Sequence, residues 1–232
     1  DVETYSNSCS YIGGLIGWGS NCLVKESYNE GVVNAIAYDY SYAGGVVGFT
    51  EFPSVIEHVY NRGRVLSNSY YYKSFVGGII GNVHNFSHIP TLVRSCYNAG
   101  QLYAVSSAFL GGICGEVVNH SEVSNAYCLQ MPSFYPTNSI GEMVDVSFLC
   151  SRQALDSLNQ GQEVWISDEA LINDGFPLLK NTGKTLVLTH SPAISSTDVV
   201  LKGSVVQLAD TVLSKAFVYK KHNATTFTHV PA

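Results

Sequence analysis

Short apolar runs bounded by Gly, Ser and Asn return at regular intervals along the first half of this chain. One phrase occurs four times with small changes, at residues 11–17 (YIGGLIG), 42–48 (YAGGVVG), 75–81 (FVGGIIG) and 109–115 (FLGGICG). The first glycines of successive copies are 31, 33 and 34 residues apart. A period of this length is typical of stacked repeats, in which each unit packs only against its neighbours.

A second signature follows each glycine phrase. Residues 28–31, 60–63 and 97–100 share Tyr-Asn-x-Gly, and the fourth copy changes to Tyr-Cys-Leu-Gln at residues 127–130. Around both signatures, β-branched and aromatic residues alternate with polar ones, and no 3.6-residue period is present. This pattern predicts two or three short strands per repeat. We therefore expect an all-β fold, a parallel β-solenoid of about four coils.

Both signatures are expected to shape the coil rather than to carry chemistry. Glycine accepts a positive φ at little cost, so the glycines should supply a turn or bulge that recurs in every coil. Stacked coils place like residues above like, which predicts a tyrosine ladder and an amide ladder along the stack. The residues with these structural roles are Gly13, Gly14, Gly17, Gly44, Gly45, Gly48, Gly77, Gly78, Gly81, Gly111, Gly112, Gly115, Tyr28, Asn29, Tyr60, Asn61, Tyr97 and Asn98, with Tyr127 in the fourth copy.

The pattern changes after the fourth copy. Residues 151–159 predict one short helix that is capped by Ser151 and stops near Gly161. This helix and Trp165 are expected to cover the open end of the stack, where unpaired strand edges invite aggregation. From about residue 184, strand-like runs predict part of a β-sandwich-like module. The expected organisation is a solenoid at 1–145, a closing segment at 146–182 and a partial β module at 183–232.

Composition and charge narrow the classes of partner. Of 232 residues, 46% are hydrophobic and only 13% are charged, about half the usual charged fraction. The formal net charge of −6 and the scattered basic residues argue against nucleic acid, which needs patches of Lys and Arg. No apolar stretch reaches the ~20 residues of a membrane helix. The chain opens on Asp1 without a Met, so we expect a piece of a longer multidomain chain.

The six cysteines include no C-x-x-C pair, which gives little support to a zinc or redox site. Cys96 and Cys114 take positions where the other copies carry small or apolar residues. We expect these two as buried free thiols that act as small hydrophobes. Disulfides are the alternative if the protein is exported.

The sequence contains no motif for catalysis or for a metal. There is no His-Glu-x-x-His, no Gly-x-Ser-x-Gly and no phosphate-loop Lys-Ser/Thr after the glycine phrases. A sugar-cleaving coil needs paired carboxylates, and the glutamates do not repeat in register; Glu26 and Glu57 are expected on a solvated face. His84 and His88 lie in a loop without an acidic third ligand. We predict no catalytic residue, no metal site and no cofactor.

Aromatic residues are the best candidates for binding. Tyr38, Tyr40 and Tyr42 alternate, which puts them on one face, and residues 70–72 are three tyrosines in the matching part of the next repeat. Such a stripe can stack on sugar rings or anchor a protein, but packing between coils is the favoured interpretation. The insert at residues 82–90 is expected to project as a loop. The candidate ligand-binding residues are Tyr38, Tyr40, Tyr42, Tyr70, Tyr71, Tyr72, His84, Phe86 and His88.

The glycine phrase followed by Tyr-Asn-x-Gly, with Cys96 directly before Tyr97, resembles the GLUG repeat. Residues 158–179, with Trp165 and the run DGFPLL at 174–179, are similar to the segment that commonly closes such arrays. The resemblance covers residues 1 to about 182. It implies an exported bacterial surface protein with tandem repeats in a β-solenoid. Members of the family include candidate adhesins and non-catalytic regions of immunoglobulin A1 metalloproteases.

The last segment is similar to the fibronectin type III-like modules of bacterial surface proteins. The similarity lies in residues 201–205 and 216–219, although Ala216 stands where these modules usually have Gly. Together the resemblances imply a non-enzymatic adhesin-like protein, extracellular or on the cell surface, that binds a host protein or glycan. The alternative is a non-catalytic accessory or spacer region of a larger exported protease or polysaccharide-degrading enzyme.

Overall fold

The structure is a computed structural model of the 232-residue chain. It describes residues 1–105, 108–131, 135–138 and 140–180, together with the backbone of six short strands after residue 180. Strands dominate, and the described part of the chain has two short helices.

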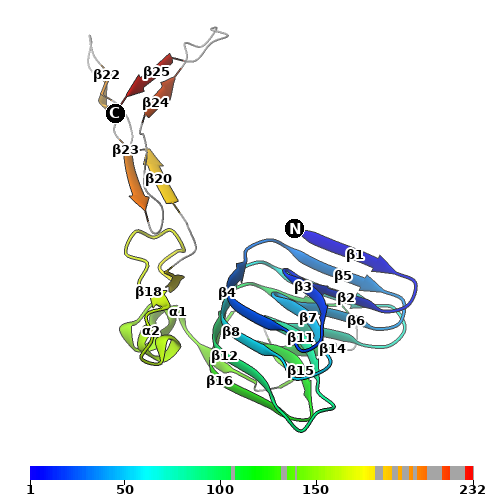
Figure 1. Ribbon diagram of the computed structural model, residues 1–232. Helices are drawn as coiled ribbons and strands as arrows, with labels where there is room; N and C mark the ends of the chain where they lie inside the picture. Colours follow the sequence, from blue (N-terminus) through cyan, green and yellow to red (C-terminus); the bar gives the residue numbers. More distant parts are fainter. Residues whose placement is uncertain are drawn as a thin grey trace.

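Each coil contributes one strand to each of four parallel sheets, which we call A, B, C and D (Figure 1). Sheet A contains β1 (Val2–Ser6), β5 (Val33–Ala37), β9 (Val65–Ser69) and β13 (Leu102–Ala104). Sheet B contains β2 (Ser10–Gly13), β6 (Ser41–Gly44), β10 (Ser74–Gly77) and β14 (Ala108–Gly111). Sheet C contains β3 (Ile16–Gly19), β7 (Val47–Thr50), β11 (Ile80–His84) and β15 (Cys114–Val118). Sheet D contains β4 (Leu23–Asn29), β8 (Val55–Asn61), β12 (Thr91–Asn98), β16 (Ser121–Leu129) and β17 (Glu142–Val144).

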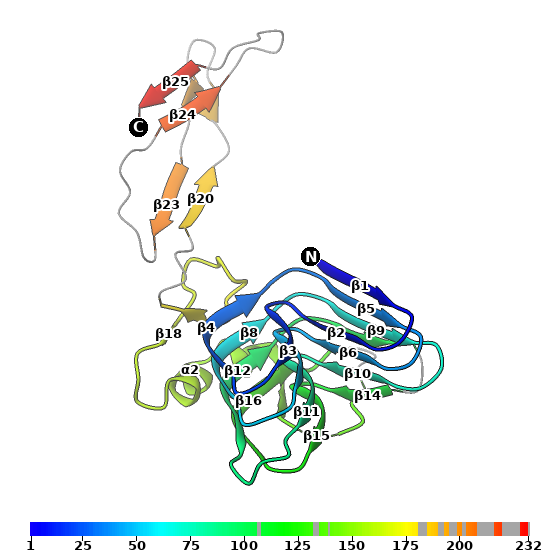
Figure 2. The same cartoon turned by 45° about the vertical axis from the view of Figure 1, so that its right-hand side comes forward.

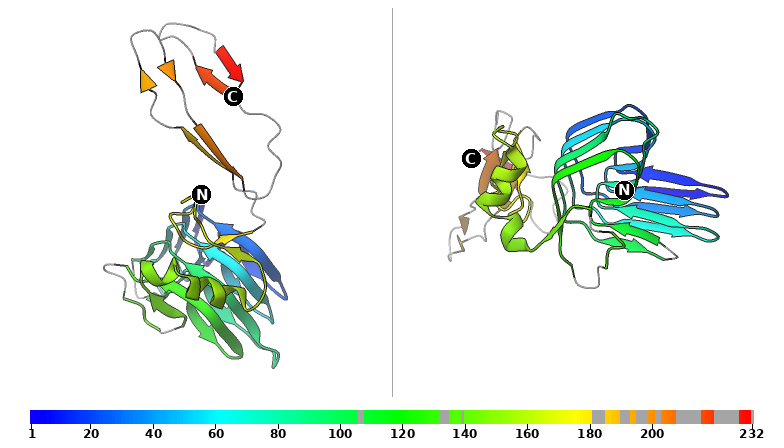
Figure 3. Two further views of the ribbon diagram at one scale, coloured as in Figure 1. Left: turned by 90° about the vertical axis from the view of Figure 1, so that its left-hand side faces the viewer. Right: turned by 90° about the horizontal axis from the view of Figure 1, so that it is seen from below.

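The repeated signatures set the register between coils. In sheet C, Val47 lies opposite Ile16 on one side and Ile80 on the other, and Ile80 lies opposite Cys114. Successive coils therefore repeat the same side chains at the same height, and their strands form parallel layers (Figure 3). The prediction of a parallel β-solenoid of about four turns is confirmed.

The interior of each coil is divided into two separate cores. Sheets A and B enclose one core, which includes Val33, Ala43 and Val76. Sheets C and D enclose the other, which includes Ile56 and Ile79. Apolar positions repeat in register, so each core continues from coil to coil along the stack.

The cysteines fit this packing. All six are free thiols. Cys96 and Cys114 are fully buried in the core between sheets C and D, where burial raises the pKa of the Cys114 thiol to about 12. The prediction of two buried thiols that act as small hydrophobes is confirmed.

The repeat glycines are required for a reason other than the expected one. None of them has a positive φ; the positive values instead recur in sheet D at Glu26, His58, Ser95 and Asn125, between 44° and 52°. At the turn from sheet B to sheet C there is no room for a side chain. A Cβ on Gly45 would lie 2.1 Å from the carbonyl oxygen of Gly78 on the next coil. The expectation of positive φ at these glycines was therefore wrong, and close approach of the backbone explains them.

The predicted amide ladder is present in the structure. Asn61 accepts hydrogen bonds at Oδ1 from the Asn29 side chain (2.8 Å) and from the Gly63 N–H (3.2 Å). Its Nδ2 donates to Gly63 O and to Asn98 Oδ1, both at 2.8 Å. Each asparagine thus closes its own turn and bonds to its neighbours in the stack. In the fourth copy Cys128 takes the asparagine position, and Asn98 Nδ2 lies 3.7 Å from its sulfur.

The predicted tyrosine ladder is also present. The rings of Tyr28 and Tyr60 stack with centroids 4.9 Å apart, and those of Tyr60 and Tyr97 at 5.1 Å. Tyr127 lies in register with Tyr97, and its ring contacts Phe148 at 5.3 Å. The ladder follows the outer side of sheet D and becomes buried where the segment after residue 145 covers it.

A charged cluster lies on the same sheet, where the sequence predicted a solvated face: Glu57 is buried, while the Lys25 and Arg94 side chains that pair with it are 47% and 49% exposed. Glu57 lies in register with Lys25 above it and Arg94 below it, and its exposed fraction is 5%. Lys25 contacts one carboxylate oxygen, and Arg94 Nε donates to the other at 2.7 Å. Burial alone would raise the pKa of Glu57, but the hydrogen bonds from Lys25 and Arg94 hold it below its usual value. Lys25 and Arg94 lie opposite Glu57 on the neighbouring coils, so opposite charges alternate along this column.

The predicted helix is confirmed as α2 (Arg152–Asn159). Ser151 Oγ accepts the Ala154 N–H at 3.2 Å, and the helix ends at Gln160 in the left-handed conformation. A second helix, α1 (Val146–Leu149), precedes it, and the pair β18 (Trp165–Ile166) and β19 (Leu178–Leu179) follows.

The position of this segment differs from the expectation. It packs on the flank of the solenoid, against the outer side of sheet D, rather than across the end of the stack (Figures 1 and 2). The Trp165 ring lies 5.6 Å from Tyr97 and 6.1 Å from Tyr60, and its Nε1 donates to His58 Nδ1 at 3.1 Å. The tyrosine ladder offers a continuous apolar column there, which attracts the apolar side of the helix.

Residues 135–138 and 140–144 instead lie against the last coil. Asn138 Nδ2 donates to Cys114 O and Gly115 O at 3.0 and 2.7 Å, and the Thr137 N–H donates to Leu110 O at 2.7 Å. Beside them β17 pairs with β16. These bonds satisfy strand-edge groups that would otherwise be open to pairing.

After residue 180 the chain forms three antiparallel pairs. They are β20 (Thr185–Thr189) with β23 (Gly203–Gln207), β21 (Ala193–Ile194) with β22 (Val199–Val200), and β24 (Ala216–Tyr219) with β25 (Thr228–Pro231). The rest of the predicted 183–232 module lies outside the described residues, and its likeness to fibronectin type III stays a prediction. In the part of the chain that the structure describes, no helix is long and apolar enough to cross a membrane.

Replacing Asn61 by Ala should destabilise the solenoid strongly. The change removes four hydrogen bonds from a fully buried position and leaves groups of Asn29, Gly63 and Asn98 unpaired. We expect the free energy of unfolding in urea to fall by about 3 kcal/mol. The control is Asn34→Ala, since Asn34 bonds only an exposed glutamate, and a change of about 0.5 kcal/mol or less is expected. Equal losses in the two variants would contradict the ladder's role.

Gly45→Ala tests the close approach of coils. The added methyl meets backbone oxygen at 2.1 Å and the Asn61 side chain at 2.4 Å, and neither can yield without breaking the ladder. We expect a loss of about 3 kcal/mol in the free energy of unfolding. Gly161→Ala is a contrasting variant with open space around it but a φ of +78°, so it should cost about 1 kcal/mol. A harmless Gly45→Ala would refute the steric explanation.

The contact between His58 and Trp165 should make stability depend on pH. Burial lowers the pKa of His58 in the folded chain, while Glu57 and Glu26 oppose this effect and Arg94 and Lys25 add to it. The unfolded chain therefore binds a proton more readily, so the stabilisation is present above the unfolded pKa of about 6.5 and is lost as pH falls through the folded pKa.

Urea unfolding of the wild type and of His58→Asn, measured between about pH 7 and pH 5, checks this prediction. Asparagine tolerates the φ of 51° at this position and does not titrate in that range. We expect the wild type to lose stability more steeply than the variant as pH falls. Parallel curves for the two proteins would show that His58 does not contribute.

Candidate functional site

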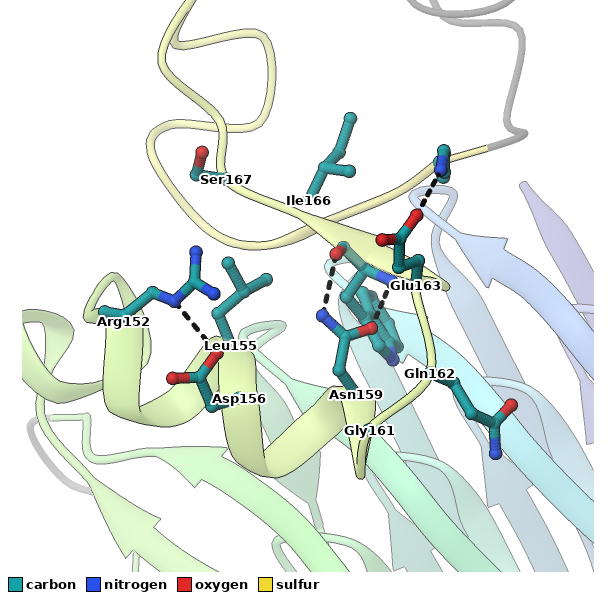
Figure 4. A pocket seen from close by; sticks show the side chains of 11 residues that line it. Arg152, Leu155, Asp156, Asn159, Gly161, Gln162, Glu163, Ile166 and Ser167 are labelled. Atoms are coloured by element: carbon teal, nitrogen blue, oxygen red, sulfur yellow. Dashed lines mark hydrogen bonds and ion pairs between the residues drawn. The ribbon is translucent and has the colours of Figure 1, made fainter.

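A hollow lies between α2 and β18 (Figure 4). Its volume is about 520 Å³. Its charged groups already pair with one another: Arg152 with Asp156 at 2.9 Å, and Lys180 with Glu163 at 3.0 Å. Asn159 is engaged as well, since its Oδ1 accepts the Trp165 N–H at 2.8 Å. The hollow thus offers a ligand no charge that lacks a partner, and its polar groups serve to hold the closing segment together.

No metal site is apparent within the described residues, since no three His, Cys, Asp or Glu side chains lie close enough to share an ion. The exposed aromatic residues remain as candidates. Their geometry follows from the coil, because each outward-facing position in a strand is repeated above and below by the next coil.

The outer side of sheet B carries a column of four aromatic rings. Tyr42 stacks on Tyr11 at 4.8 Å and on Phe75 at 4.7 Å, and Phe75 stacks on Phe109 at 5.0 Å. The ring planes are within 8° of parallel, so the faces of the inner rings are covered by neighbours and their edges point away from the sheet. Burial raises the pKa of Tyr42, with a smaller effect from Tyr11, and the hydroxyl stays protonated.

Phe49 of sheet C joins the two regions that the sequence singled out. Its ring lies 5.3 Å from Tyr42 on one side and 6.4 Å from His84 on the other. His84 in turn contacts Phe86 at 4.3 Å. Phe49 is itself buried, with an exposed fraction of 9%, so a buried ring connects the tyrosines before the glycine phrase to His84 and Phe86, although these are far apart in the sequence.

The tyrosine corner, which we define as residues 38–40 and 70–72, continues this series of ring contacts. It lies where the chain passes from sheet A to sheet B in the second and third coils. Tyr40 contacts Tyr42 at 6.3 Å and stacks on Tyr72 at 4.8 Å; Tyr38 stacks on Tyr71 at 5.9 Å. We call the complete chain of ring contacts the aromatic surface; it runs through Tyr38, Tyr71, Tyr72, Tyr40, Tyr42, Phe49, His84 and Phe86.

Two predicted residues are not in this chain of ring contacts. The His88 ring contacts His120 at 5.6 Å, and Tyr70 is bonded through its backbone N–H to Ala37 O. Tyr70 is 63% exposed, which leaves its side chain available at the corner. The predicted projection of residues 82–90 as a loop is correct only in part: residues 82–84 belong to β11, where Asn82 and Val83 are buried, while Phe86 and Ile89 in the loop that follows are 60% and 67% exposed.

The tyrosines of this surface both pack between coils and remain exposed. From the sequence alone, packing between coils and availability for binding were alternative interpretations. Tyr38 and Tyr71 stack on each other and are still 53% and 65% exposed. Tyr42 is half-buried, and Phe75 is almost fully buried. Packing therefore accounts for the rings on sheet B, while the rings at the corner remain accessible to a partner.

Sequence reasoning missed Phe49 and Trp18, which extend the surface on sheet C. Trp18 lies in register with Phe49, contacts it edge to face at 5.8 Å and is 55% exposed. The available signal was the residue directly after the last glycine of each phrase, which is Trp18 and Phe49 in the first two copies. In the third and fourth copies Asn82 and Glu116 stand there and bond to each other at 2.7 Å.

Comparison with known proteins adds no relative from which a role can be transferred: no protein-family model, no curated protein and no solved structure matches this chain.

Proposed function

We propose that this chain is a non-enzymatic, adhesin-like binding protein of the GLUG-repeat kind, secreted or held on a bacterial cell surface. In this proposal the solenoid presents the aromatic surface to a host protein or a glycan. The observation that carries it is the unbroken chain of ring contacts from Tyr38 to Phe86, with both ends exposed.

The scaffold supports a binding role. Loops that carry binding residues work best when a rigid framework positions them. Here the amide ladder and the backbone bonds between coils hold each ring at a fixed height. Tyrosine supplies a large apolar face together with a hydroxyl, which suits recognition of partially polar surfaces.

A spacer role, as part of a larger exported enzyme, is the second candidate. The observation that favours it is the stack itself, because three columns of side chains bond or stack along its length: Tyr28 to Tyr97, Asn29 to Asn98 and Lys25 to Arg94. A coil tied together in this way is a stiff element that can hold two other domains apart. The two roles predict different results in a binding assay.

Binding can be tested with two sets of probes: an array of neutral and acidic glycans, and purified fibronectin, laminin, type IV collagen and fibrinogen. If the proposal holds, the wild type binds at least one probe, and Tyr38→Ala combined with Tyr72→Ala weakens that binding by about tenfold or more. Tyr103→Ala is the matched control, since Tyr103 is 46% exposed on sheet A, and it should bind as the wild type does. Binding of no probe in either set would favour the spacer.

A further inference from the structure

The tyrosine corner has the geometry of a preformed protein-binding site. Its two loops are aligned by hydrogen bonds between the second and third coils. The N–H groups of Tyr70, Tyr71 and Tyr72 donate to the carbonyl oxygens of Ala37, Tyr38 and Asp39 at 3.1, 2.8 and 3.2 Å. These bonds continue the pattern of the parallel sheet beyond the ends of its strands.

Side-chain bonds hold the corner further. Ser69 Oγ contacts the carbonyl oxygen of Asp39, and the same hydroxyl accepts the Tyr72 N–H at 3.2 Å. Stacking of Tyr38 on Tyr71 and of Tyr40 on Tyr72 then limits the rotation of the rings. A partner that binds this corner has little conformational entropy to remove, which favours affinity.

The chemistry of the corner is that of a protein-binding loop. Four tyrosines, at 38, 70, 71 and 72, are between 47% and 65% exposed. Loops rich in Tyr bind proteins well because tyrosine gives rigid contact area with a polar end.

A sugar fits this corner less well. A sugar ring stacks on the open face of an aromatic ring. Tyr38 and Tyr71 cover one face of each other, as do Tyr40 and Tyr72, and the planes of Tyr71 and Tyr72 are at 88°. The exposed area is therefore divided among single ring faces, ring edges and hydroxyls that point in several directions, and it does not form one flat platform. A protein surface, which is itself uneven, can fill such a shape.

The charge at the corner indicates the kind of residue that the partner presents. Asp39 lies between Tyr38 and Tyr40 and accepts a hydrogen bond from Ser8 Oγ at 3.2 Å; within the described residues it has no ion-pair partner. The nearby cation, Lys73, places its Nζ over the Phe109 ring at 4.6 Å. The carboxylate is thus available to a cationic side chain, which the tyrosine rings can also contact through cation–π attraction.

We propose that the tyrosine corner is the docking site for a protein that places a lysine or arginine side chain against Asp39 and the surrounding rings. This proposal rests on the binding function proposed above and names its partner class. The other rings of the aromatic surface support the corner from behind and do not contact the partner in this arrangement.

The test uses the full chain and the four protein probes named above, with the glycan array beside them, and it compares variants at the corner with one elsewhere. We expect at least one protein to bind. Tyr71→Ala should weaken that binding by about tenfold or more, because a central tyrosine of a protein interface commonly contributes this much. Asp39→Asn should weaken it by several-fold and reduce its dependence on salt, since the attraction between charges is screened by ions.

Two comparisons keep the test decisive. Tyr103→Ala, at an exposed aromatic position outside the aromatic surface, is the control and should bind as the wild type does. Trp18→Ala, at an exposed position on sheet C, tests whether the partner contacts the aromatic surface outside the corner. Unfolding in urea should show the same stability for Tyr71→Ala and Tyr103→Ala, so that lost binding reflects lost contacts. Alkylating or acetylating the lysines of the bound probe, or blocking its arginines, should also reduce binding.

Each other outcome overturns a stated part of the proposal. If only glycans bind, or if Trp18→Ala abolishes binding while Tyr71→Ala and Asp39→Asn do not, the proposed binding function stands and the assignment of the corner to a protein is wrong. If Tyr71→Ala weakens protein binding but Asp39→Asn and salt have no effect, the cationic contact is wrong. If no probe of either set binds, the binding function fails for these classes and the assignment of the corner fails with it.

Discussion

The close approach of successive coils at the turn from sheet B to sheet C is the constraint on which the rest of the structure depends. The Gly45 position leaves 2.1 Å between a hypothetical Cβ and the backbone of the next coil, and the equivalent distance at Gly78 is also 2.1 Å. Only at this spacing do Asn29, Asn61 and Asn98 bond to one another. The glycines and the amide ladder are therefore parts of one contact, in which the missing side chain of each glycine makes room for the asparagine amide of its own coil.

The same spacing explains the aromatic surface. Parallel strands bring equivalent residues of successive coils to about 4.8 Å, which is close to the distance at which two flat rings stack. Tyr11, Tyr42 and Phe75 satisfy it on sheet B, and Tyr28, Tyr60 and Tyr97 on sheet D. The tyrosine column on sheet D is covered by Trp165 and the two helices, which pack against it. The column on sheet B is accounted for by packing, but the tyrosine corner beside it remains accessible, and for this reason we place the binding function at the corner.

The sequence predicted the contacts that repeat and missed those that depend on geometry around the coil. A strict period places like above like, so the solenoid and both ladders followed from it. The pairing of Glu57 with Lys25 could also have been predicted from the sequence, because the offset of 32 residues between Asn29 and Asn61 places Glu57 opposite Lys25. By contrast, the repeat period contains no information on the angle or the contacts between sheets B and C. The contact of Phe49 with Tyr42 and His84 could therefore not be predicted. The position of α2 was missed for a related reason, since an amphipathic helix requires only an apolar face and does not specify which one.

The division of each coil into two cores has a mechanical consequence. The core between sheets A and B and the core between sheets C and D are separated by backbone at the glycine turns. A larger side chain in one core can displace the side chains above and below it in the same core. Across the coil it contacts main chain at the glycine turns, which cannot move aside. Strain therefore spreads along the stack more easily than across it, and the two halves of the solenoid behave as parallel columns that share a rigid seam.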